Sequence, residues 1–192
     1  GLEALQVFLS KLSSDLNCSY IIAQHLSPTH RSMMVDLLGR ITNIPVIEVQ
    51  NGMVIKEKTI YMTPENTDIF VSNGRLYLKS IEQTYGPKPS VNYFLNSLAQ
   101  AYGVKSIGII LSGTGSDGAF GIRALKASGG ITIAQSPLSA KYDGMPISAI
   151  NTGKVDIVAP IDKIAQEVSR IVENLGKNVS DSINSGIVSQ IY

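Results

Sequence analysis

A glycine-rich loop, Gly113-Thr-Gly-Ser-Asp-Gly118, holds the residues whose types and spacing are best suited to chemistry. It follows an apolar run, Ser106–Leu111, and leads into a helical pattern, Ala119–Lys126. A strand, a glycine-rich turn and a helix in succession place backbone N–H groups and one side chain at the edge of an α/β sheet. The loop is therefore interpreted either as a cofactor-binding loop or as a catalytic loop.

The cofactor interpretation rests on a literal match to G-x-G-x-x-G, the dinucleotide-binding pattern. That pattern requires an acidic residue at the end of the next strand, where it binds the ribose hydroxyl. Here the next predicted strand ends at Gln135, and the nearest acid, Asp143, lies in a later loop. Asp117 would also place a carboxylate where the pyrophosphate approaches, and the two would repel. Dinucleotide binding is therefore disfavoured.

The catalytic interpretation pairs Asp117 with His25, which follows another predicted strand. Because parallel strands bring their carboxyl ends to one edge of a sheet, the two side chains can meet there. An aspartate that accepts from the imidazole N–H fixes the tautomer of a general base. Plainer alternatives remain open: Asp117 at a helix start interacts well with the macrodipole, and a histidine can simply end a strand. The second histidine, His30, follows a predicted helix start and is expected to be exposed.

A histidine–aspartate pair needs a nucleophile, and the sequence offers no obvious one. Cys18 begins its strand and is expected at the opposite edge of the sheet, while Ser112 and Ser116 flank the loop as turn and cap residues. The sequence contains no G-x-S-x-G elbow. It starts at Gly1, directly before a helical pattern, as if the strand and turn of such an elbow had been cut away.

The surrounding elements are predicted from apolar periodicity. Strands are expected at 19–24, 106–111, 131–135 and 155–158, and helices at 2–12, 27–40, 90–102, 119–127, from about 146 to 153, and 161–172. Short β-like runs between 44 and 80 interrupt this alternation, with Asn51-Gly52 and Asn73-Gly74 as hairpin signals. The pattern predicts an α/β fold: a doubly wound, mostly parallel sheet with helices on both faces and an inserted β-hairpin segment.

Composition excludes several classes of function. The net charge is +1 and there is no dense Lys/Arg run, so nucleic acid is not an expected partner. No apolar run approaches the roughly 20 residues that span a bilayer, so membrane insertion is not expected. One cysteine and two histidines make a zinc cluster improbable. The single cysteine, Cys18, excludes an internal disulfide and fits a reducing, cytoplasmic compartment. The stretch 176–192 is polar and linker-like.

Several motifs together resemble the catalytic domain of the chemotaxis receptor protein-glutamate methylesterases, the CheB family. They are spread over about residues 1–172 and are specific as a set. The matching stretches are Gly1-Leu-Glu-Ala-Leu5, Ile22-Ala-Gln-His25, Pro89-Ser-Val91, Gly108-Ile-Ile-Leu-Ser-Gly-Thr-Gly-Ser-Asp-Gly-Ala119, Ile133-Ala-Gln135 and Tyr142-Asp-Gly-Met-Pro146.

This resemblance implies hydrolysis of glutamate methyl esters on chemoreceptors, and a related glutamine deamidation, by a Ser-His-Asp triad without a cofactor. It gives His25 the role of general base, Asp117 the role of orienting it, and the Thr114 N–H the role of an oxyanion donor. The serine belongs to a Gly-Ala-Ser-x-Gly-Gly turn whose last glycine is similar to Gly1. The chain as printed is therefore expected to lack its first strand and its nucleophile, and to be essentially inactive.

The resemblance also sets the expected organisation and partners. Residues 1–175 are expected to form the methylesterase-like domain and 176–192 a tail. Methylated chemoreceptor helices, and a receiver or methyltransferase domain in the same parent protein, are the expected partners. A non-catalytic regulatory module is the alternative. Lys88 and Asn92 depart from the arginine and aspartate expected around Pro89-Ser-Val91, which bears on contacts in the substrate groove.

Overall fold

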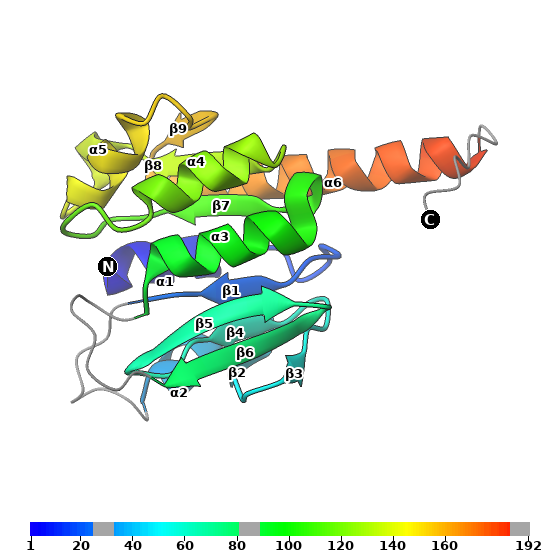
Figure 1. Cartoon of the computed structure of the whole chain (residues 1–192), viewed down its shortest axis with the longest axis horizontal. Helices are drawn as coiled ribbons and strands as arrows, with labels where there is room; N and C mark the ends of the chain where they lie inside the picture. The colour runs from blue at the N-terminus through cyan, green and yellow to red at the C-terminus, as the bar shows by residue number, and fades with distance from the viewer. Residues whose placement is uncertain (25–32, 81–88, 185–192) are drawn as a thin grey trace.

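The structure is a computed structural model that describes residues 1–24, 33–80 and 89–184. Its helices alternate with strands along most of the chain (Figure 1). The helices are α1 Leu2–Ser10, α2 Met33–Gly39, α3 Val91–Tyr102, α4 Ala119–Ala127, α5 Gly144–Ile150 and α6 Ile161–Asn184, with short 3-10 turns at Gly103–Lys105 and Pro137–Ser139. The strands are β1 Tyr20–Ile22, β2 Val46–Glu48, β3 Met53–Val54, β4 Ile60–Met62, β5 Thr67–Ser72, β6 Arg75–Ser80, β7 Ile107–Ile110, β8 Ile131–Gln135 and β9 Ile157–Ala159.

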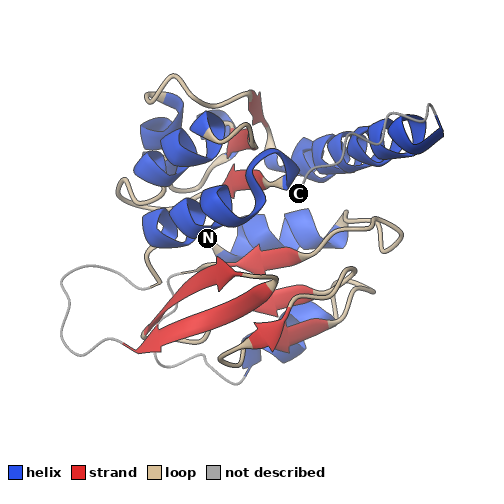
Figure 2. Cartoon of the chain, turned by 45° about the vertical axis from the view of Figure 1, so that its right-hand side comes forward, coloured by secondary structure: helices blue, strands red, loops and turns tan. Residues whose placement is uncertain are grey.

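Within the described residues, the strands form three groups of three. Two groups are parallel, in the orders β1-β4-β2 and β7-β8-β9, and the third, β3-β6-β5, is antiparallel. In both views, α3 lies between the group that contains β1 and the group that contains β7 (Figures 1 and 2). The predicted α/β class, with mostly parallel strands and an inserted β segment, is confirmed.

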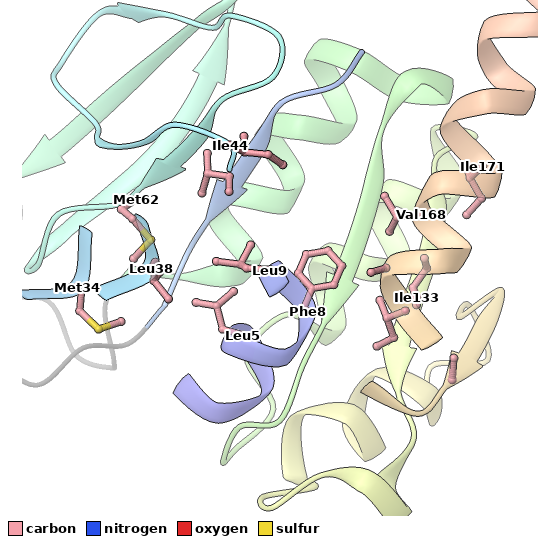
Figure 3. Packing of buried hydrophobic residues seen from close by; sticks show 14 residues of the cluster. Leu5, Phe8, Leu9, Met34, Leu38, Ile44, Met62, Ile133, Val168 and Ile171 are labelled. Carbon is pink, nitrogen blue, oxygen red and sulfur yellow. The ribbon is translucent and has the colours of Figure 1, made fainter. Parts of the chain in front are cut away.

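Helices cover both faces of the parallel strands, and each face has its own core. Along β4, Ile60 and Met62 point to one face and Tyr61 to the other, because side chains alternate along a strand. The first core joins α1, α2 and α6, with Leu5, Phe8 and Leu9 of α1 at its centre (Figure 3). The second core joins α3, α4 and α5 to the antiparallel strands. Burial on both faces explains why these strands are nearly continuous apolar runs.

One of the two hairpin predictions is confirmed and the other is wrong. Asn73 and Gly74 both have positive φ and connect β5 to β6, as the two-residue turn requires. The turn at Asn51-Gly52 does not close a hairpin, because β2 pairs with β4 and β3 pairs with β6. Instead Asn51 Oδ1 accepts from Leu78 N–H at 2.9 Å, so the turn docks on β6 while the chain crosses between sheets.

Helix α6 extends beyond the predicted end at Val172, through Asn184. The sequence spacing of Leu175, Val179 and Ile183 continues the helical period, and a single glycine, Gly176, costs a helix interior only about 1 kcal/mol. No helix in the described parts of the chain is long and apolar enough to cross a membrane.

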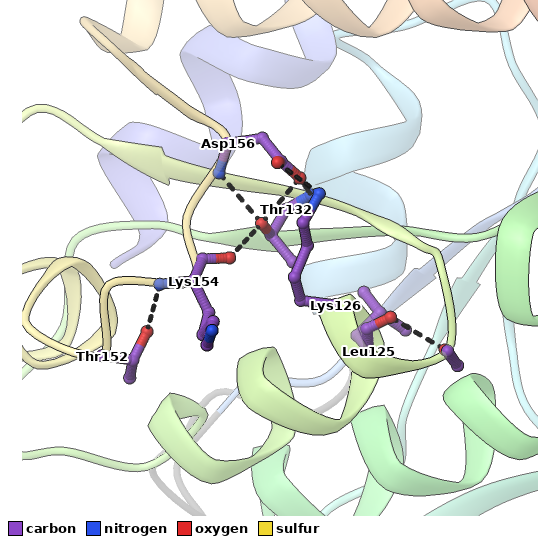
Figure 4. Close-up of polar contacts among 7 residues, drawn as sticks. Leu125, Lys126, Thr132, Thr152, Lys154 and Asp156 are labelled. Atoms are coloured by element: carbon purple, nitrogen blue, oxygen red, sulfur yellow. Dashed lines mark hydrogen bonds and ion pairs between the residues drawn. The ribbon is translucent and has the colours of Figure 1, made fainter.

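A polar cluster ties the amino end of β8 to the turn before β9 (Figure 4). Asp156 Oδ2 accepts from the N–H and the hydroxyl of Thr132 at 2.9 and 3.0 Å, and Lys126 Nζ donates to Asp156 Oδ1. Burial alone would raise the pKa of Asp156, but the hydrogen bonds from Lys126 and Thr132 and the Lys126 charge outweigh it and hold that pKa below its usual range. The ionised carboxylate therefore stabilises this corner.

Replacing Asp156 by asparagine is expected to lower the melting temperature at pH 7 and to lose this effect in acid. Because the folded pKa lies below the unfolded value of about 3.9, the stabilisation is complete above roughly pH 5 and disappears as the pH falls through the folded pKa. Thermal unfolding of both proteins between pH 7 and pH 2.5 measures the difference. The control is Asp15→Asn, which removes an exposed carboxylate in a turn. A melting-temperature difference for Asp156→Asn that is constant across this range contradicts the assignment.

Candidate active site

The loop after β7 is held in place by backbone hydrogen bonds to the segment that begins α5. Gly113 N–H donates to Tyr142 O, and Met145 N–H donates to Gly113 O, both at 2.9 Å. Ser112 Oγ accepts from Tyr142 N–H at 3.0 Å. Two separate segments at the carboxyl ends of the parallel strands are therefore joined into one surface, and Ser112 has the turn-holding role expected from the sequence.

Glycines allow these two segments to approach closely. A Cβ on Gly113 would lie 2.4 Å from Met145 Sδ, and a Cβ on Gly144 would lie 3.1 Å from the backbone nitrogen of Gly115. Gly115 and Gly118 have positive φ of 85° and 101°, a conformation that glycine adopts without steric cost. The glycines of the loop are thus explained by packing and backbone conformation rather than by a bound pyrophosphate.

Gln135, the last residue of β8, fixes the start of the loop. Its side chain is almost fully buried, its Oε1 accepts from Ser112 N–H at 2.8 Å, and its Nε2 donates to Ser139 O at 2.9 Å. In the sequence, Gln135 served to disfavour dinucleotide binding and belonged to one of the stretches that carry the family resemblance, but this bridging role was not predicted. Its position at a strand end was the signal, and its amide connects the loop after β7 to the turn that contains Ser139.

Asp117 binds the amino terminus of α3. Its Oδ2 accepts from Val91 N–H at 2.8 Å and its Oδ1 accepts from Asn92 N–H at 3.0 Å. These N–H groups belong to the first turn of a helix, where a carboxylate is favoured by the hydrogen bonds and by the macrodipole. The carboxylate is therefore oriented by α3. The predicted cap at Ser90 is confirmed, because its Oγ accepts from Tyr93 N–H at 3.3 Å.

Asn92 makes the reciprocal connection, which the sequence did not reveal. Its Oδ1 accepts from Gly118 N–H at 3.0 Å and from Gly121 N–H at 2.9 Å, at the start of α4. The α4 residues place no capping side chain of their own on these groups. The resemblance led us to expect aspartate at position 92. Asparagine still supplies an acceptor for the N–H groups of α4, and it does not add a second carboxylate beside Asp117.

Thr114 lies at the exposed tip of the loop, and its N–H has no hydrogen-bond partner among the described residues. The Gly1 nitrogen donates to Ser112 O, so the start of α1 lies beside this loop. Gly1, Gln24, Gly113 and Thr114 are among the residues that line a large cavity between β1 and β7. His25 and His30 lie outside the described residues, so the pairing of His25 with Asp117 stays a prediction.

Cys18 lies ahead of β1, at the end of the strand away from the loop. Burial raises the pKa of its thiol, with a smaller opposing effect from Tyr20. A protonated thiol is a poor nucleophile, and the position is remote from Thr114. Both observations agree with the sequence-based exclusion of Cys18.

The sequence model of the CheB methylesterase family matches residues 1–168. The chain is 36% identical over 172 residues to the protein-glutamate methylesterase/protein-glutamine glutaminase of group 3 operon from Rhizobium meliloti, covering 89% of this chain and 49% of that protein. It is 32% identical over 177 residues to the corresponding protein from Archaeoglobus fulgidus, covering 90% and 51%. The chain thus spans about half the length of these curated relatives.

A solved structure agrees with the sequence comparisons. The Thermotoga maritima CheB methylesterase catalytic domain superimposes with a TM-score of 0.81 at 26% identity, covering 90% of this chain and 92% of that one. A putative methylesterase/glutaminase from Leptospira interrogans is 30% identical over 175 residues, covering 91% of both chains. The family match, the relatives and the fold all agree: the chain belongs to the CheB methylesterase family.

Proposed function

We propose that this domain hydrolyses glutamate methyl esters, and deamidates the corresponding glutamines, on chemoreceptor helices. The observation that carries the proposal is the contact of the Gly1 nitrogen with Ser112 O, which places the start of α1 beside the 113–118 loop, in a chain of the CheB methylesterase family. Gln24 and Thr114 line the same cavity as Gly1. An acyl-transfer site needs a nucleophile, a general base and an oxyanion donor. In this proposal they come from the turn that precedes α1, from His25 and from the Thr114 N–H.

In the proposed reaction, a serine in the turn that leads into Gly1 attacks the ester carbonyl. His25 takes the serine proton and returns it to the departing methanol, and water then releases the glutamate. Asp117, held by α3, orients His25. The Thr114 N–H stabilises the oxyanion, an interaction worth about 10²–10³ in kcat when such a donor is removed. No cofactor takes part.

Methanol release from a methylated chemoreceptor fragment tests the proposal. The printed chain is compared with a chain extended by an apolar strand and the Gly-Ala-Ser-x-Gly turn ahead of Gly1, and with the same extension carrying alanine for serine. The serine extension is expected to turn over, and loss of the triad serine costs about 10⁶ in rate in a comparable hydrolase. Equal rates for the serine and alanine extensions contradict the proposal. So does activity of the printed chain that Ser112→Ala or Ser116→Ala abolishes.

The natural partners follow from the same proposal. The chain covers about half the length of the curated relatives from Rhizobium meliloti and Archaeoglobus fulgidus. In this proposal, a receiver or methyltransferase domain in the parent protein corresponds to their other half. The substrate is a receptor helix that presents methylated glutamates near the exposed tip of the 113–118 loop.

A further inference from the structure

The chain leaves the sheet after β7 at a point where one side chain takes over from backbone pairing. Strand β7 pairs with β8 as far as Ile110 and Ala134, and the next residue of β8, Gln135, pairs with Ala159 of β9. Beyond Ile110, the Oε1 of Gln135 accepts from Ser112 N–H at 2.8 Å. An amide side chain therefore continues the connection between β7 and the central strand of this group by one more bond.

The buried amide of Gln135 has one favourable orientation. Its Nε2 donates to Ser139 O at 2.9 Å and to Ser139 Oγ at 3.2 Å, and only 1% of the residue is exposed. Turning the amide over would direct its NH₂ group at the Ser112 N–H and its oxygen at Ser139 O, so that donor meets donor and acceptor meets acceptor. Because unpaired polar groups are costly at a buried position, the side chain presents a fixed acceptor to Ser112.

Gln135 ties the loop to the sheet itself. The bonds from Gly113 N–H to Tyr142 O and from Met145 N–H to Gly113 O join the loop to the segment that begins α5. Two segments joined in this way can shift together relative to the strands. Since Gln135 belongs to the buried central strand, its bond to Ser112 fixes the loop relative to the sheet.

This anchor and the next peptide group determine the direction of the Thr114 N–H. The C=O of Gly113 and the N–H of Thr114 belong to one planar trans peptide group, so they point in opposite directions. Because Gly113 O accepts from Met145 N–H, the Thr114 N–H points away from Met145. It is the first N–H group after the anchor at Ser112 that has no hydrogen-bond partner among the described residues.

We infer that Gln135 is a positioning residue for the proposed reaction: by holding Ser112, it aims the Thr114 N–H at the oxyanion of the tetrahedral intermediate. The inference rests on the proposed function and adds to it the group that sets the oxyanion donor. Gln135 is almost fully buried and acts through Ser112. Negative charge develops on the ester oxygen on the way to the transition state, so a misdirected donor lowers kcat and leaves KM nearly unchanged.

The first test is Gln135→Met in the chain extended by the strand and the serine turn. Methionine has a similar length but offers the Ser112 N–H only a weak sulfur acceptor. Because a misplacement of about 1 Å can cost about 10²-fold in rate, kcat for methyl ester hydrolysis is expected to fall about 10- to 100-fold, with KM within about twofold. An unchanged kcat, or a change confined to KM, overturns the inference.

Thr132→Val is the matched control, because Thr132 is a buried polar residue at the opposite end of the same strand (Figure 4). Its Oγ1 donates to Lys154 O at 2.6 Å and accepts from Asp156 N–H at 3.0 Å. The control is expected to lower the melting temperature, as Gln135→Met does, but to keep kcat within about twofold. If both variants lower kcat equally, Gln135 acts only through stability and the inference is wrong.

Gln135→Glu separates the hydrogen bond from packing. This side chain keeps an oxygen acceptor for the Ser112 N–H in both protonation states. Burial favours the neutral carboxyl, whose O–H can also donate to Ser139 O. The variant is expected to keep kcat within about fivefold of the unchanged extended chain. Equal losses of kcat in Gln135→Glu and Gln135→Met contradict the role of Gln135 as an acceptor.

A measurement on the printed chain separates this inference from the proposed activity. The NMR order parameter of the Thr114 N–H reports the order of the loop without any turnover. It is expected to be about 0.85 and to fall below about 0.6 in Gln135→Met, but not in Thr132→Val. If the extended chain does not hydrolyse the ester, the proposed function fails, and this order parameter alone decides whether Gln135 positions the Thr114 N–H. An unchanged order parameter in Gln135→Met overturns the inference.

Discussion

Replacing Asp117 by asparagine is expected to lower kcat for methyl ester hydrolysis by about 10⁴-fold, with little change in KM, in the chain extended by the serine turn. An amide in place of the carboxylate holds the general base in the wrong tautomer, and in the serine-protease triad this change has that magnitude. The substituted side chain also loses one acceptor for the N–H groups of Val91 and Asn92, at a cost of about 1 kcal/mol in stability. Steady-state kinetics together with urea unfolding separate the two effects.

Asp68→Asn is the matched control, because Asp68 is a second carboxylate at the same helix terminus. Its Oδ1 accepts from Ser90 N–H at 2.8 Å, one residue before the groups that Asp117 binds. The control is expected to lose a similar amount of stability and to keep kcat within about threefold. If both variants lower kcat equally, Asp117 acts only by holding α3, and the triad assignment fails.

The second large effect is expected from Gly121→Val, at the contact between α3 and α4. A Cβ at position 121 would lie 2.6 Å from Leu95 Cβ and 2.9 Å from Leu95 Cδ1. Leu95 Cβ is attached directly to the backbone of α3 and moves only with that helix. A side chain at position 121 therefore forces α3 and α4 apart. Overpacking of this kind costs about 1–3 kcal/mol and sometimes more, and we expect about 3 kcal/mol in the free energy of unfolding by urea.

Gly176→Val provides the comparison for this prediction. Gly176 is also a glycine inside a helix, but a Cβ there would meet no atom within 4 Å. Valine is a slightly better helix former than glycine, so this variant is expected to change stability by less than about 0.5 kcal/mol. Similar losses at positions 121 and 176 would show that helix propensity, rather than the close α3–α4 contact, governs both sites.

Local signals in the sequence predicted most of the elements. The apolar runs that became β7 and β8, the cap at Ser90 and the turn at Asn73-Gly74 depend on a few neighbouring residues, which a sequence displays directly. The turn at Asn51-Gly52 carries the same local signal but connects strands of different sheets. Strand pairing there is decided by partners far along the chain.

The candidate site was predictable in part for the same reason. Asp117 and Thr114 stand in a recognisable loop, so their positions at the end of β7 followed from the sequence. The bonds from Asn92 to α4 and from Gln135 to Ser112 and Ser139 cross between elements. No local pattern marks them, because each depends on how α3 packs on α4 and on how β8 meets the loop after β7.

The crossed bonds between α3 and α4 make the site loop part of a single cooperative unit. Asp117, ahead of α4, satisfies the first amides of α3, and Asn92 of α3 satisfies the first amides of α4. Fraying of either helix therefore removes the cap of the other, so both open together at one free-energy cost. A loop with three glycines would otherwise sample many conformations, but here its order is established by the helix pair before a substrate arrives. In the proposed reaction, the entropy of arranging the Thr114 amide would then be lost during folding and not during catalysis.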